Sequence, residues 1–357
     1  MTNLVGRPRA ELERLLAPEV DRPFRTRQVA SWLLERHAAS FAEMTNLPKV
    51  LRAALARRFA IADPEVLRRT AAGDGTVKYL LALEDGATVE AVSMPEGARA
   101  TLCLSSQTGC AVGCTFCVTG ALGPGRNLTA AEMVGQYRLM VRELPPSVER
   151  VNLVFMGMGE PLLNTQALGT ALEVLYESVS PKRITVSTSG IIPGIRWLGG
   201  LPRPPKLAVS LNAPDQRRRE RVMPISRRYP LPDLLRELRR FPLDGGRRIT
   251  FEYVLIRDFN DAEEDAAAVA RLLRGIPSKV NVIPLNEDPV HLPGLHRPPG
   301  EVVDRFGERL RRAGLVVTVR VSRGSEVAAA CGQLKGAHQA RSATSESCLP
   351  ALSPSRR

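Results

Sequence analysis

The hydrophobic pattern of the first part of the chain has helical spacing. Between residues 8 and about 60, apolar side chains recur three or four positions apart, as in Leu51, Leu55 and Phe59. This period predicts amphipathic helices, and Pro48 suits the first turn of the last one. The chain therefore begins with a small helical region that is rich in arginine.

The pattern changes to period two between residues 76 and 94. Alternating apolar residues are followed by the turn pair Asp85-Gly86 and then by a second apolar run from Val89 to Met94. Alternation around such a turn pair predicts a β-hairpin. The hairpin joins the helical region to the rest of the chain.

After residue 100, apolar runs alternate with amphipathic segments. Thr129 and Glu132 form a capping box, and Gly275 and Gly314 stand where helices should end. This alternation predicts an α/β fold with a parallel sheet or barrel, whose working face lies at the carboxyl ends of the strands. The expected strands are 101–105, 151–156, 183–187, 207–211, 249–256, 280–284 and 316–321.

Length and composition fit one large α/β domain with a smaller appendage. The chain has 357 residues, of which 44% are hydrophobic. No stretch approaches the roughly 20 apolar residues of a membrane span, and residues 1–14 lack the apolar core of a signal peptide. We therefore expect a cytoplasmic protein with no membrane partner.

The charge balance is strongly basic. Lys and Arg number 50 against 37 Asp and Glu, for a net charge of +13, with arginine runs at 217–219, 227–228, 239–240 and 247–248. The excess favours a polyanionic partner such as a nucleic acid. A solvated surface with counterions is the alternative that charge alone leaves open.

Three of the six cysteines form the triplet Cys110-x3-Cys114-x2-Cys117, directly after the first strand of the α/β part. Three thiolates this close can hold three irons of a 4Fe-4S cluster and leave the fourth iron open to a ligand. A partial zinc knuckle or buried thiols are the alternatives, but none of the four histidines lies near the triplet in sequence.

Three further positions carry potential chemistry. The turn that ends in Gly159 and Glu160 combines close backbone approach with an acceptor for a cationic amine. Cys103 precedes the triplet by seven residues, and Cys331 follows a loop after the last strand. Isolated cysteines are most often inert core thiols, but these two could face one cavity and form a redox pair.

These motifs resemble one family over residues 20 to 336, in order and with similar spacing. The cysteine triplet with Phe116 looks like the signature of the radical S-adenosylmethionine (radical SAM) superfamily, and Phe155-Met-Gly-Met-Gly-Glu160-Pro161 resembles that superfamily's Gly-Gly-Glu segment. The wider set is similar to the RlmN/Cfr family of RNA adenine C-methyltransferases. The motifs that carry this narrower resemblance are Phe24-Arg-x-Arg-Gln-Val29, Phe41-x-x-Met-Thr-Asn-Leu-Pro48, Arg99-Ala-Thr-Leu-Cys103, Arg126-Asn127-Leu128, Ser187-Thr-Ser-Gly190 and Ala330-Cys331-Gly-Gln-Leu334.

The resemblance implies a fold and a division of the chain. The fold is a radical SAM partial (βα)6 TIM-like barrel with a small N-terminal helical domain and a β-hairpin extension. We expect a helical RNA-binding domain at 1–75, the hairpin at 76–98, the core barrel with the methyl-carrier cysteine loop at 99–335, and a disordered tail at 336–357. Cys348, in that tail, matches no motif.

The resemblance also assigns the site. Cys110, Cys114 and Cys117 would hold one 4Fe-4S cluster per chain. Glu90 would be the general base, Cys331 the methyl carrier and Cys103 its resolving partner. Asn212 stands where many relatives carry histidine, and both side chains can offer a hydrogen-bond acceptor. The positions that would contact S-adenosylmethionine are Gly159, Glu160, Ser187, Ser210, Leu211, Asn212 and Asn286.

The implied mechanism is a radical one, because the C2-H of adenine is neither acidic nor electron-rich. Two S-adenosylmethionine molecules are used per turnover: one methylates Cys331, and the other is cleaved at the cluster to a 5′-deoxyadenosyl radical. That radical takes hydrogen from the S-methyl group, and the resulting carbon radical adds to the adenine ring. Glu90 removes the ring proton, and Cys103 attacks Cys331 to release the product as a disulfide forms.

The implied substrates are one adenosine in the peptidyl-transferase region of 23S rRNA and one beside the anticodon in some tRNAs. The target base must be unstacked to reach the cavity. The helical region and the arginine runs would hold the phosphate backbone in a salt-dependent way. A reducing partner such as flavodoxin or ferredoxin is expected, and the enzyme is expected to be a monomer.

Three alternatives stay open at this stage. A Cfr-like C8-methyltransferase would share the triplet and the cysteine pair. Another radical SAM enzyme, acting on a protein or a small molecule, would not need Cys103 and Cys331 together. A non-catalytic iron–sulfur protein that chaperones RNA would bind RNA tightly without cleaving S-adenosylmethionine.

Overall fold

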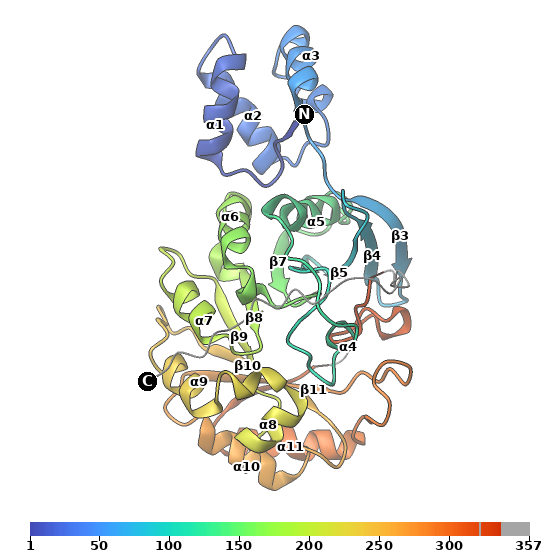
Figure 1. The fold of residues 1–357 in the computed structure, drawn as a ribbon, viewed down its shortest axis with the longest axis vertical. Coiled ribbons are helices and arrows are strands. Elements are labelled where there is room, and N and C mark those ends of the chain that lie inside the picture. Colours follow the sequence, from blue (N-terminus) through green and yellow to red (C-terminus); the bar gives the residue numbers. More distant parts are fainter. Residues whose placement is uncertain (321–322, 337–357) are drawn as a thin grey trace, which may run out of the picture.

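The N-terminal part is a group of short helices at one end of the molecule (Figure 1). In this computed structural model, which describes residues 1–320 and 323–336, the helices are α1 (Arg9–Leu16), α2 (Phe24–Leu34) and α3 (Lys49–Arg58). Pro48 directly precedes α3. The short strands β1 (Thr2–Asn3) and β2 (Phe59–Ala60) pair in parallel across the base of the group. The helices predicted for this region are confirmed.

A ten-stranded sheet forms the body of the protein, in the order β12-β11-β10-β9-β8-β7-β6-β5-β4-β3. Strands β6 to β12 are parallel to one another, and β5, β4 and β3 extend the sheet from β6 in antiparallel pairing. The strands are β3 (Glu65–Ala71), β4 (Val77–Ala82), β5 (Thr88–Glu96), β6 (Arg99–Cys103), β7 (Arg150–Phe155), β8 (Ile184–Thr188), β9 (Lys206–Ser210), β10 (Ile249–Leu255), β11 (Ser278–Pro284) and β12 (Val316–Val319).

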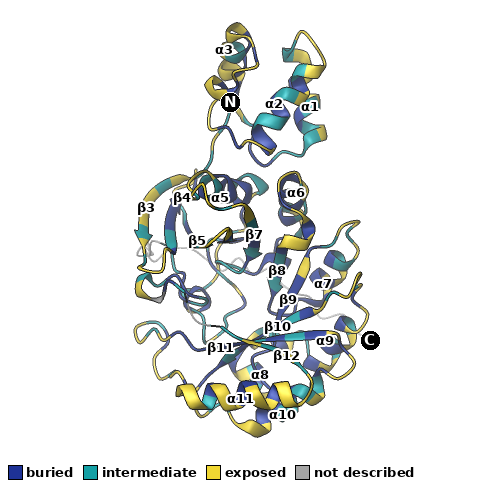
Figure 2. Cartoon of the chain, turned by 180° about the vertical axis from the view of Figure 1, so that it is seen from behind, coloured by how far each residue is buried: buried dark blue, intermediate teal, exposed yellow. Residues whose placement is uncertain are grey.

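Helices connect the parallel strands in six consecutive βα units, and β12 follows the sixth. They turn exposed faces outward while the strands are buried (Figure 2). The predicted partial (βα)6 barrel with its hairpin extension is therefore confirmed. The connecting α-helices are α4 (Val118–Ala121), α5 (Ala130–Arg142), α6 (Thr165–Leu175), α7 (Ile192–Gly199), α8 (Gln216–Val222), α9 (Leu231–Leu238), α10 (Glu263–Leu272) and α11 (Gly300–Arg312).

Single-turn 3-10 helices punctuate the connections. They are η1 (Ala17–Glu19), η2 (Phe41–Glu43), η3 (Pro161–Leu163), η4 (Pro181–Arg183), η5 (Pro224–Arg227) and η6 (Ser325–Val327). The predicted helix signals are also present: Thr129 and Glu132 form the capping box of α5, and Gly275 and Gly314 have positive φ just after α10 and α11. Positive φ at a helix end suits glycine, which lacks a Cβ.

Strand β3 was not predicted. Its residues are mostly exposed, and its sequence, Glu-Val-Leu-Arg-Arg-Thr-Ala, offers no continuous apolar face. It pairs with β4 through six residue pairs with a register shift between Val66 and Arg68. An edge strand of this kind is formed by backbone pairing, which the hydrophobic pattern does not report.

A buried ion pair fastens the helical group to the barrel. Arg138 of α5 donates to Asp63 (2.8 Å) and to the carbonyls of Leu33 and Ala38 (2.7 Å each). The His37 ring packs edge-on against Tyr137, with 3.3 Å between His37 Nε2 and the hydroxyl oxygen. Arg138 thus provides hydrogen bonds to two carbonyl groups at and just after the end of α2, and its contact with Asp63 holds the segment that leads into β3.

Some expectations fall outside the described residues. The final predicted strand extends to residue 321, but β12 ends at Val319 and residues 321–322 are not described. The predicted tail beyond residue 336, with Cys348, is likewise outside the described range. Among the described residues, no helix combines the length and apolar character needed to cross a membrane.

Candidate active site

One cavity opens at the carboxyl ends of the parallel strands and gathers most of the predicted site residues. The space within it, counting the part open to solvent, measures about 920 Å³. A cavity of this size can hold a nucleoside-sized cofactor beside a metal cluster. Of the predicted residues, it is lined by Cys110, Cys114, Cys117, Gly159, Glu160, Ser187, Ser210, Asn212, Asn286 and Cys331.

The cysteine triplet lies in a loop that backbone contacts hold in place. The Cys110 N–H donates to the Gly123 carbonyl (2.8 Å), and the Cys117 N–H donates to the Cys114 carbonyl (3.2 Å). A Cβ at Gly120 would meet the Cys114 carbonyl oxygen at 2.9 Å, so the turn packs too closely for a side chain there. Burial raises the pKa of Cys110 to about 12 and raises the pKa of Cys114 and of Cys117.

The triplet supplies the three thiol ligands that a 4Fe-4S cluster would need, and all three line the cavity. Among the described residues, no three His, Cys, Asp or Glu side chains converge closely enough to hold one metal ion. Thiolates that ligate different irons of a cubane need not share one centre. Because the free thiols are costly to ionise when buried, binding of a metal would drive their deprotonation.

A buried arginine lies beneath the triplet. Arg219 of α8 is fully buried, and it donates to the carbonyls of Leu211 (3.1 Å), Ser189 (2.6 Å) and Ser210 (2.9 Å), and to the Ser226 hydroxyl. Burial lowers the pKa of Arg219 to about 10. This corrects our reading of the 217–219 run as a phosphate-binding surface, because Arg219 joins strand ends inside the protein.

Glu160 is held rigidly at the end of β7. Its Oε2 accepts the Ser189 N–H at 2.6 Å, its Oε1 accepts the Leu162 N–H at 3.0 Å, and its own N–H donates to Gln107 at 2.8 Å. Burial raises the pKa of Glu160, although the Ser189 N–H favours its charged form. A cationic amine in the cavity would therefore complete the solvation of this carboxylate.

Gly159 is required by the geometry of this turn. Its φ is +96°, and a Cβ there would meet Gln107 Cβ at 2.5 Å. Glycine is the residue that tolerates both constraints. The turn therefore presses the backbone beside Glu160 against the segment that leads into the cysteine loop.

Two polar residues that we did not predict also line the cavity. Ser189 Oγ and Glu252 Oε2 are buried and have no hydrogen-bond partner among the described residues. Asn281 Nδ2 donates a hydrogen bond to Glu252 Oε1 (3.0 Å), and burial raises the pKa of Glu252. Ser189 lies within the quoted Ser187–Gly190 motif, whereas Glu252 sits in an apolar strand that carried no signal.

Two of the predicted cofactor contacts are less direct than expected. Leu211 does not line the cavity; its side chain is buried in the core, and its N–H donates to the Glu252 carbonyl (2.9 Å). Asn212 lines the cavity, but its Oδ1 accepts the Val254 N–H (2.9 Å) and its Nδ2 lies 3.4 Å from Met223 Sδ. Asn212 also has a φ of +55°, a conformation that asparagine tolerates better than most residues.

A second, smaller cavity adjoins the first and brings Cys103 and Cys331 together. Both cysteines line it, and Cys331, Arg320 and Asn286 line both cavities. Burial, with a contribution from Cys331, raises the pKa of Cys103 to about 12. The proximity of Cys331, followed by that of Glu252 and Cys103, raises the pKa of Arg320 despite its burial. The two thiols, 228 residues apart, thus share one space with a cation beside them.

The loop that carries Cys331 is anchored through its backbone. Asn286 Nδ2 donates to the Cys331 carbonyl (3.0 Å), and the Val118 N–H donates to the Gly332 carbonyl (2.7 Å). The Thr119 hydroxyl donates to the Leu334 carbonyl. These contacts tie the loop to α4, directly after the cysteine triplet, and to the end of β11.

Glu90 lies beneath the end of this loop and lines neither cavity. It is 2% exposed, and its Oε1 is 3.1 Å from Lys78 Nζ. Its Oε2 accepts the backbone N–H of Lys335 at 2.8 Å. Glu90 is therefore buried, but the structure does not bring its carboxylate to the wall of either cavity.

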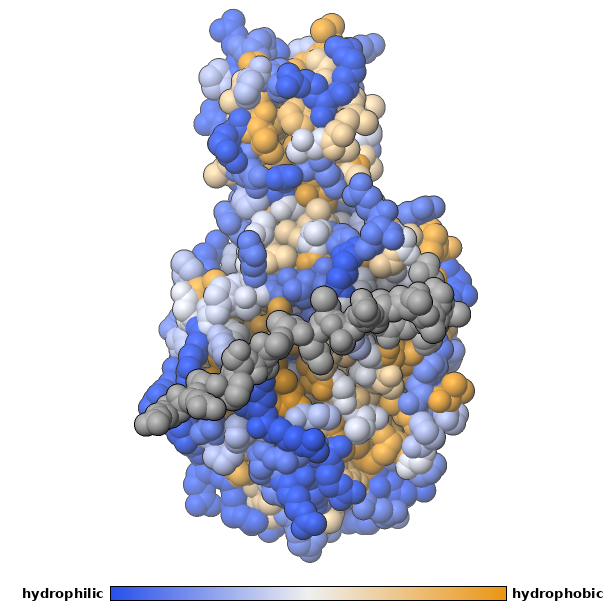
Figure 3. Space-filling model, viewed as in Figure 1, coloured by the Kyte–Doolittle hydropathy of each residue, from blue (hydrophilic) through white to orange (hydrophobic). Residues whose placement is uncertain are grey.

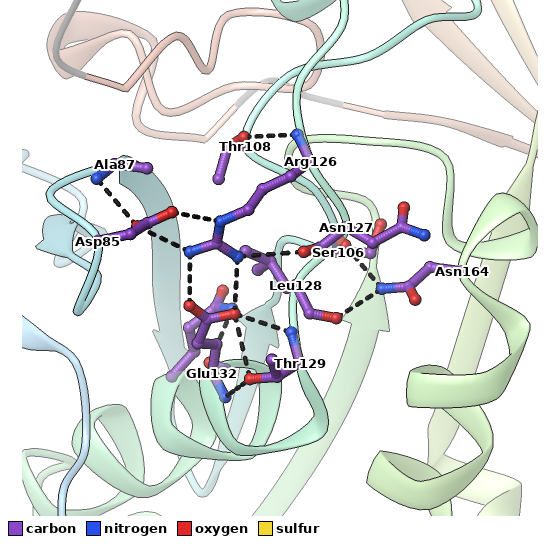
Figure 4. Close-up of polar contacts among 11 residues, drawn as sticks. Asp85, Ala87, Ser106, Thr108, Arg126, Asn127, Leu128, Thr129, Glu132 and Asn164 are labelled. Carbon is purple, nitrogen blue, oxygen red and sulfur yellow. Dashed lines mark hydrogen bonds and ion pairs between the residues drawn. The ribbon is translucent and has the colours of Figure 1, made fainter. Parts of the chain in front are cut away.

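Arg126 joins the far end of the cysteine loop to two other elements (Figure 4). Its guanidinium contacts both carboxylate oxygens of Asp85, in the hairpin turn, and both of Glu132, in the capping box of α5. The Arg126 N–H also donates to Thr108 Oγ1 (3.0 Å). Asn164, directly before α6, completes the network by donating to the carbonyls of Ser106 (3.1 Å) and Leu128 (2.8 Å).

Comparison with known proteins shows which family has this architecture. Residues 2–61 match the family model of the ribosomal RNA large subunit methyltransferase N-terminal domain, and residues 104–270 match that of the radical SAM superfamily. The dual-specificity RNA methyltransferase RlmN of Anaeromyxobacter sp. (strain Fw109-5) is 49% identical over 337 residues, which cover 92% of this chain and 89% of the relative. The chain belongs to the RlmN family. The resemblance that the motifs predicted is therefore confirmed.

Other members of the RlmN family support the same assignment. RlmN of Geobacter sulfurreducens is 46% identical, with coverage of 94% of this chain and 92% of the relative. The crystal structure of a radical SAM methyltransferase from Sphaerobacter thermophilus superposes with a TM-score of 0.87 at 43% identity, covering 94% of this chain and 99% of that one. Sequence and fold thus agree over nearly the whole chain.

Membership of the RlmN family implies a 4Fe-4S cluster and S-adenosylmethionine, and the cavity fits both groups. Three half-buried cysteines face it, and Arg219 places a buried positive charge close to Cys114. Ser189 Oγ and Glu252 Oε2 leave hydrogen-bonding capacity open to a polar ligand. An anionic cluster and a ligand with amine and hydroxyl groups would satisfy these atoms.

Proposed function

We propose that this protein methylates C2 of one adenosine in the peptidyl-transferase region of 23S rRNA, and of an adenosine beside the anticodon in tRNAs. The observation that carries the proposal is the shared cavity of Cys103 and Cys331, which adjoins the cavity of the cysteine triplet. Relatives bearing the RlmN name act on RNA with dual specificity. A methyl-carrier mechanism needs the two cysteines close to each other and close to the cluster site.

In this proposal Cys110, Cys114 and Cys117 hold one cluster per chain. When bound, the cluster and S-adenosylmethionine supply radical chemistry and the methyl group. Glu160 binds the amine of the cofactor, and Ser187, Ser210 and Asn286 contact its remaining polar groups, with Ser189 and Glu252 as further partners. Asn212 and Leu211 act through the backbone, since Asn212 uses its side-chain amide within the fold and Leu211 is buried in the core.

The chain's own chemistry belongs to two cysteines and one carboxylate. Cys331 accepts a methyl group on sulfur and later carries the methylene that joins it to the adenine ring. Glu90 takes the ring proton, and the unpaired electron left by the radical addition would return to the cluster, so that a closed-shell thioether joins Cys331 to the base. The Cys103 thiol then gives up its proton and attacks the Cys331 sulfur; a disulfide forms, the carbon–sulfur bond breaks, and its electron pair returns to the base-bound carbon, which takes up a proton.

Several partners follow from this cycle. Each turnover consumes two S-adenosylmethionine molecules, and the Cys103–Cys331 disulfide must be reduced before the next one. A flavodoxin or ferredoxin would deliver the electrons for the radical step. We infer a monomer that works in the cytoplasm, because ribosomes and these reductants are found there.

The RNA would reach the cavity over a basic rim. Arg217, Arg221, Arg227 and Arg228 are exposed on and after α8, which begins shortly after Asn212 at the cavity mouth. Hydrophilic side chains gather over this part of the molecule (Figure 3). We infer that these arginines and the N-terminal helices hold phosphates, with affinity that falls steeply as salt rises.

The deciding experiment reconstitutes the enzyme anaerobically with iron, sulfide, a reductant and labelled S-adenosylmethionine, and then digests treated 23S rRNA and tRNA. We expect 2-methyladenosine in both, located on the ring by fragmentation mass spectrometry. The Cys103→Ala variant should leave RNA covalently attached to Cys331. Methyl at C8 would overturn the regiochemistry, and full activity of Cys331→Ala would overturn the carrier mechanism.

A further inference from the structure

Lys78 of β4 connects the predicted base to the loop of the methyl carrier. Its ammonium lies 3.1 Å from Glu90 Oε1 and donates to the Ala328 carbonyl at 3.2 Å. Only 12% of its side chain is exposed, against 3% for Glu90. The cation therefore sits in a largely buried position between two oxygens that belong to distant parts of the chain.

The register of the hairpin places Lys78 and Glu90 on one face. Leu80 pairs with Glu90 and Lys78 with Val92, so the two charged residues are diagonal neighbours on adjacent antiparallel strands. Long side chains in this arrangement reach one another. The backbone of Glu90 is also held, because its carbonyl accepts the Ser105 hydroxyl at 2.6 Å and its N–H lies 3.3 Å from Met158 Sδ.

The other contact of Lys78 is with the loop at 328–335 that carries Cys331, here called the carrier loop. Ala328 precedes Cys331 by three residues and has a φ of +49°, which is unfavourable for a residue with a Cβ. A charge-assisted hydrogen bond to its carbonyl helps to hold this turn. The loop returns to the same carboxylate at its other end, where the Lys335 N–H donates to Glu90 Oε2.

We propose that Lys78 is a positioning residue for the methyl transfer, holding the Glu90 carboxylate and the Cys331 loop in one mutual geometry. This inference rests on the proposed function, in which Glu90 takes a proton from the base attached to Cys331. An ammonium has three donors, so Lys78 can bind Glu90 Oε1 and the Ala328 carbonyl oxygen at once. One side chain thereby ties the Glu90 carboxylate to the backbone of the loop that presents Cys331.

A merely structural ion pair would behave differently. Loss of such a pair would reduce cluster content, S-adenosylmethionine cleavage and product formation together. Loss of a positioning contact affects the step that Glu90 performs and spares the earlier ones. Because Cys103 attacks after the proton has left, the covalent RNA–Cys331 adduct should then accumulate.

The test compares reconstituted holoenzyme carrying Lys78→Met, Lys78→Arg or the control Lys182→Met. Lys182 is exposed in η4, before β8, at the opposite end of the barrel from the cavity. Iron content, cleavage of S-adenosylmethionine and methylation of Cys331, read from the intact mass, are measured first. A 23S rRNA fragment is then added, and adduct and product are quantified on denaturing gels and by mass spectrometry.

We expect Lys78→Met to keep iron, cofactor cleavage and Cys331 methylation, while product formation falls by about tenfold or more, within the range for a displaced general base, and adduct accumulates. Lys78→Arg should recover most of the product, and Lys182→Met should match the parent enzyme. Parent-like adduct and product in Lys78→Met, parallel loss of all steps, or failure of Lys78→Arg to recover product would overturn the inference. Full activity of Cys331→Ala would instead overturn the proposed function.

Discussion

Arg126, which follows the cysteine triplet, grips both carboxylate oxygens of Asp85 in the hairpin turn. The same guanidinium also holds Glu132 of α5, so three segments of the chain meet at one side chain. The Arg126-Asn127-Leu128 motif therefore has a structural basis. It closes the loop that presents the three thiols.

Replacing Arg126 should loosen the cysteine loop. Because the guanidinium is 37% exposed and its partners form a network, we expect Arg126→Met to cost about 1 kcal/mol of unfolding free energy. We also expect the reconstituted variant to lose its cluster faster, as measured by the decay of its visible absorbance under a chelator. Arg196→Met is the control, since Arg196 pairs with Glu237 on the outside of the barrel. Equal decay rates for the two variants would contradict the role given to Arg126.

Arg219→Lys should be far more damaging than its conservative chemistry suggests. The guanidinium bonds four oxygens at once, and an ammonium has three donors on a different geometry. Each buried oxygen left without a donor costs about 1–3 kcal/mol. We expect a loss of about 2 kcal/mol or more in urea unfolding, together with poor cluster retention.

The matched variant for Arg219 is the neighbouring Arg217→Lys. Arg217 is exposed, so this change should leave the unfolding midpoint where it was. Arg217→Met should instead weaken RNA binding and reduce its salt dependence. A parent-like unfolding midpoint for Arg219→Lys would contradict the buried network.

His37 should make stability depend on pH. Burial lowers its pKa to about 4, with Arg138 and Arg142 acting in the same direction, and its Nδ1 has no partner among the described residues. The unfolded chain binds the proton near pH 6.5 while the folded protein stays neutral, so stability is full above that pH and falls as pH drops toward 4. Between pH 7 and pH 5 the expected loss from this residue is about 2 kcal/mol. In His37→Phe, urea unfolding should lack this component; an unchanged pH slope would contradict it.

Gly159→Ala should weaken cofactor binding without removing a polar group. The added methyl would clash with Gln107 at a φ of +96°, displacing the carboxylate that follows it. We expect an increase of at least about tenfold in the dissociation constant of S-adenosylmethionine, measured by equilibrium binding to the reconstituted protein. Gly200→Ala is the control, because its nearest contacts would be at 3.5 Å. Parent-like affinity in Gly159→Ala would show that the turn can adapt.

The sequence predicted the parallel strands well because each is a short apolar run, and most of these runs are largely buried, although β12 is partly exposed. It failed for β3, whose exposed residues give no such run. It also could not separate Arg219 from Arg217, since neighbouring arginines in one run differ only in the side of α8 that they occupy. A charged residue in a sequence must have polar groups around it in the folded protein. The sequence does not say whether these are water molecules, as for Arg217, or carbonyl oxygens, as for Arg219.

The functional site likewise contains residues that the sequence identified and residues that it could not identify. The triplet and the Glu160 turn are local motifs, so their meeting in one cavity followed from strand ends that share an edge. Glu252 could not be found in this way, because it is a single acid inside an apolar strand. The burial of Glu90 beneath the carrier loop depends on a contact across 245 residues, which no local pattern encodes.

The loop around Cys331 is tethered by its own peptide groups, through Ala328, Cys331, Gly332, Leu334 and Lys335. None of these five tethers uses the sulfur atom. In the proposed cycle the sulfur becomes a thioether, then carries the nucleotide, and then forms half of a disulfide, and none of these changes requires a backbone contact of the loop to break.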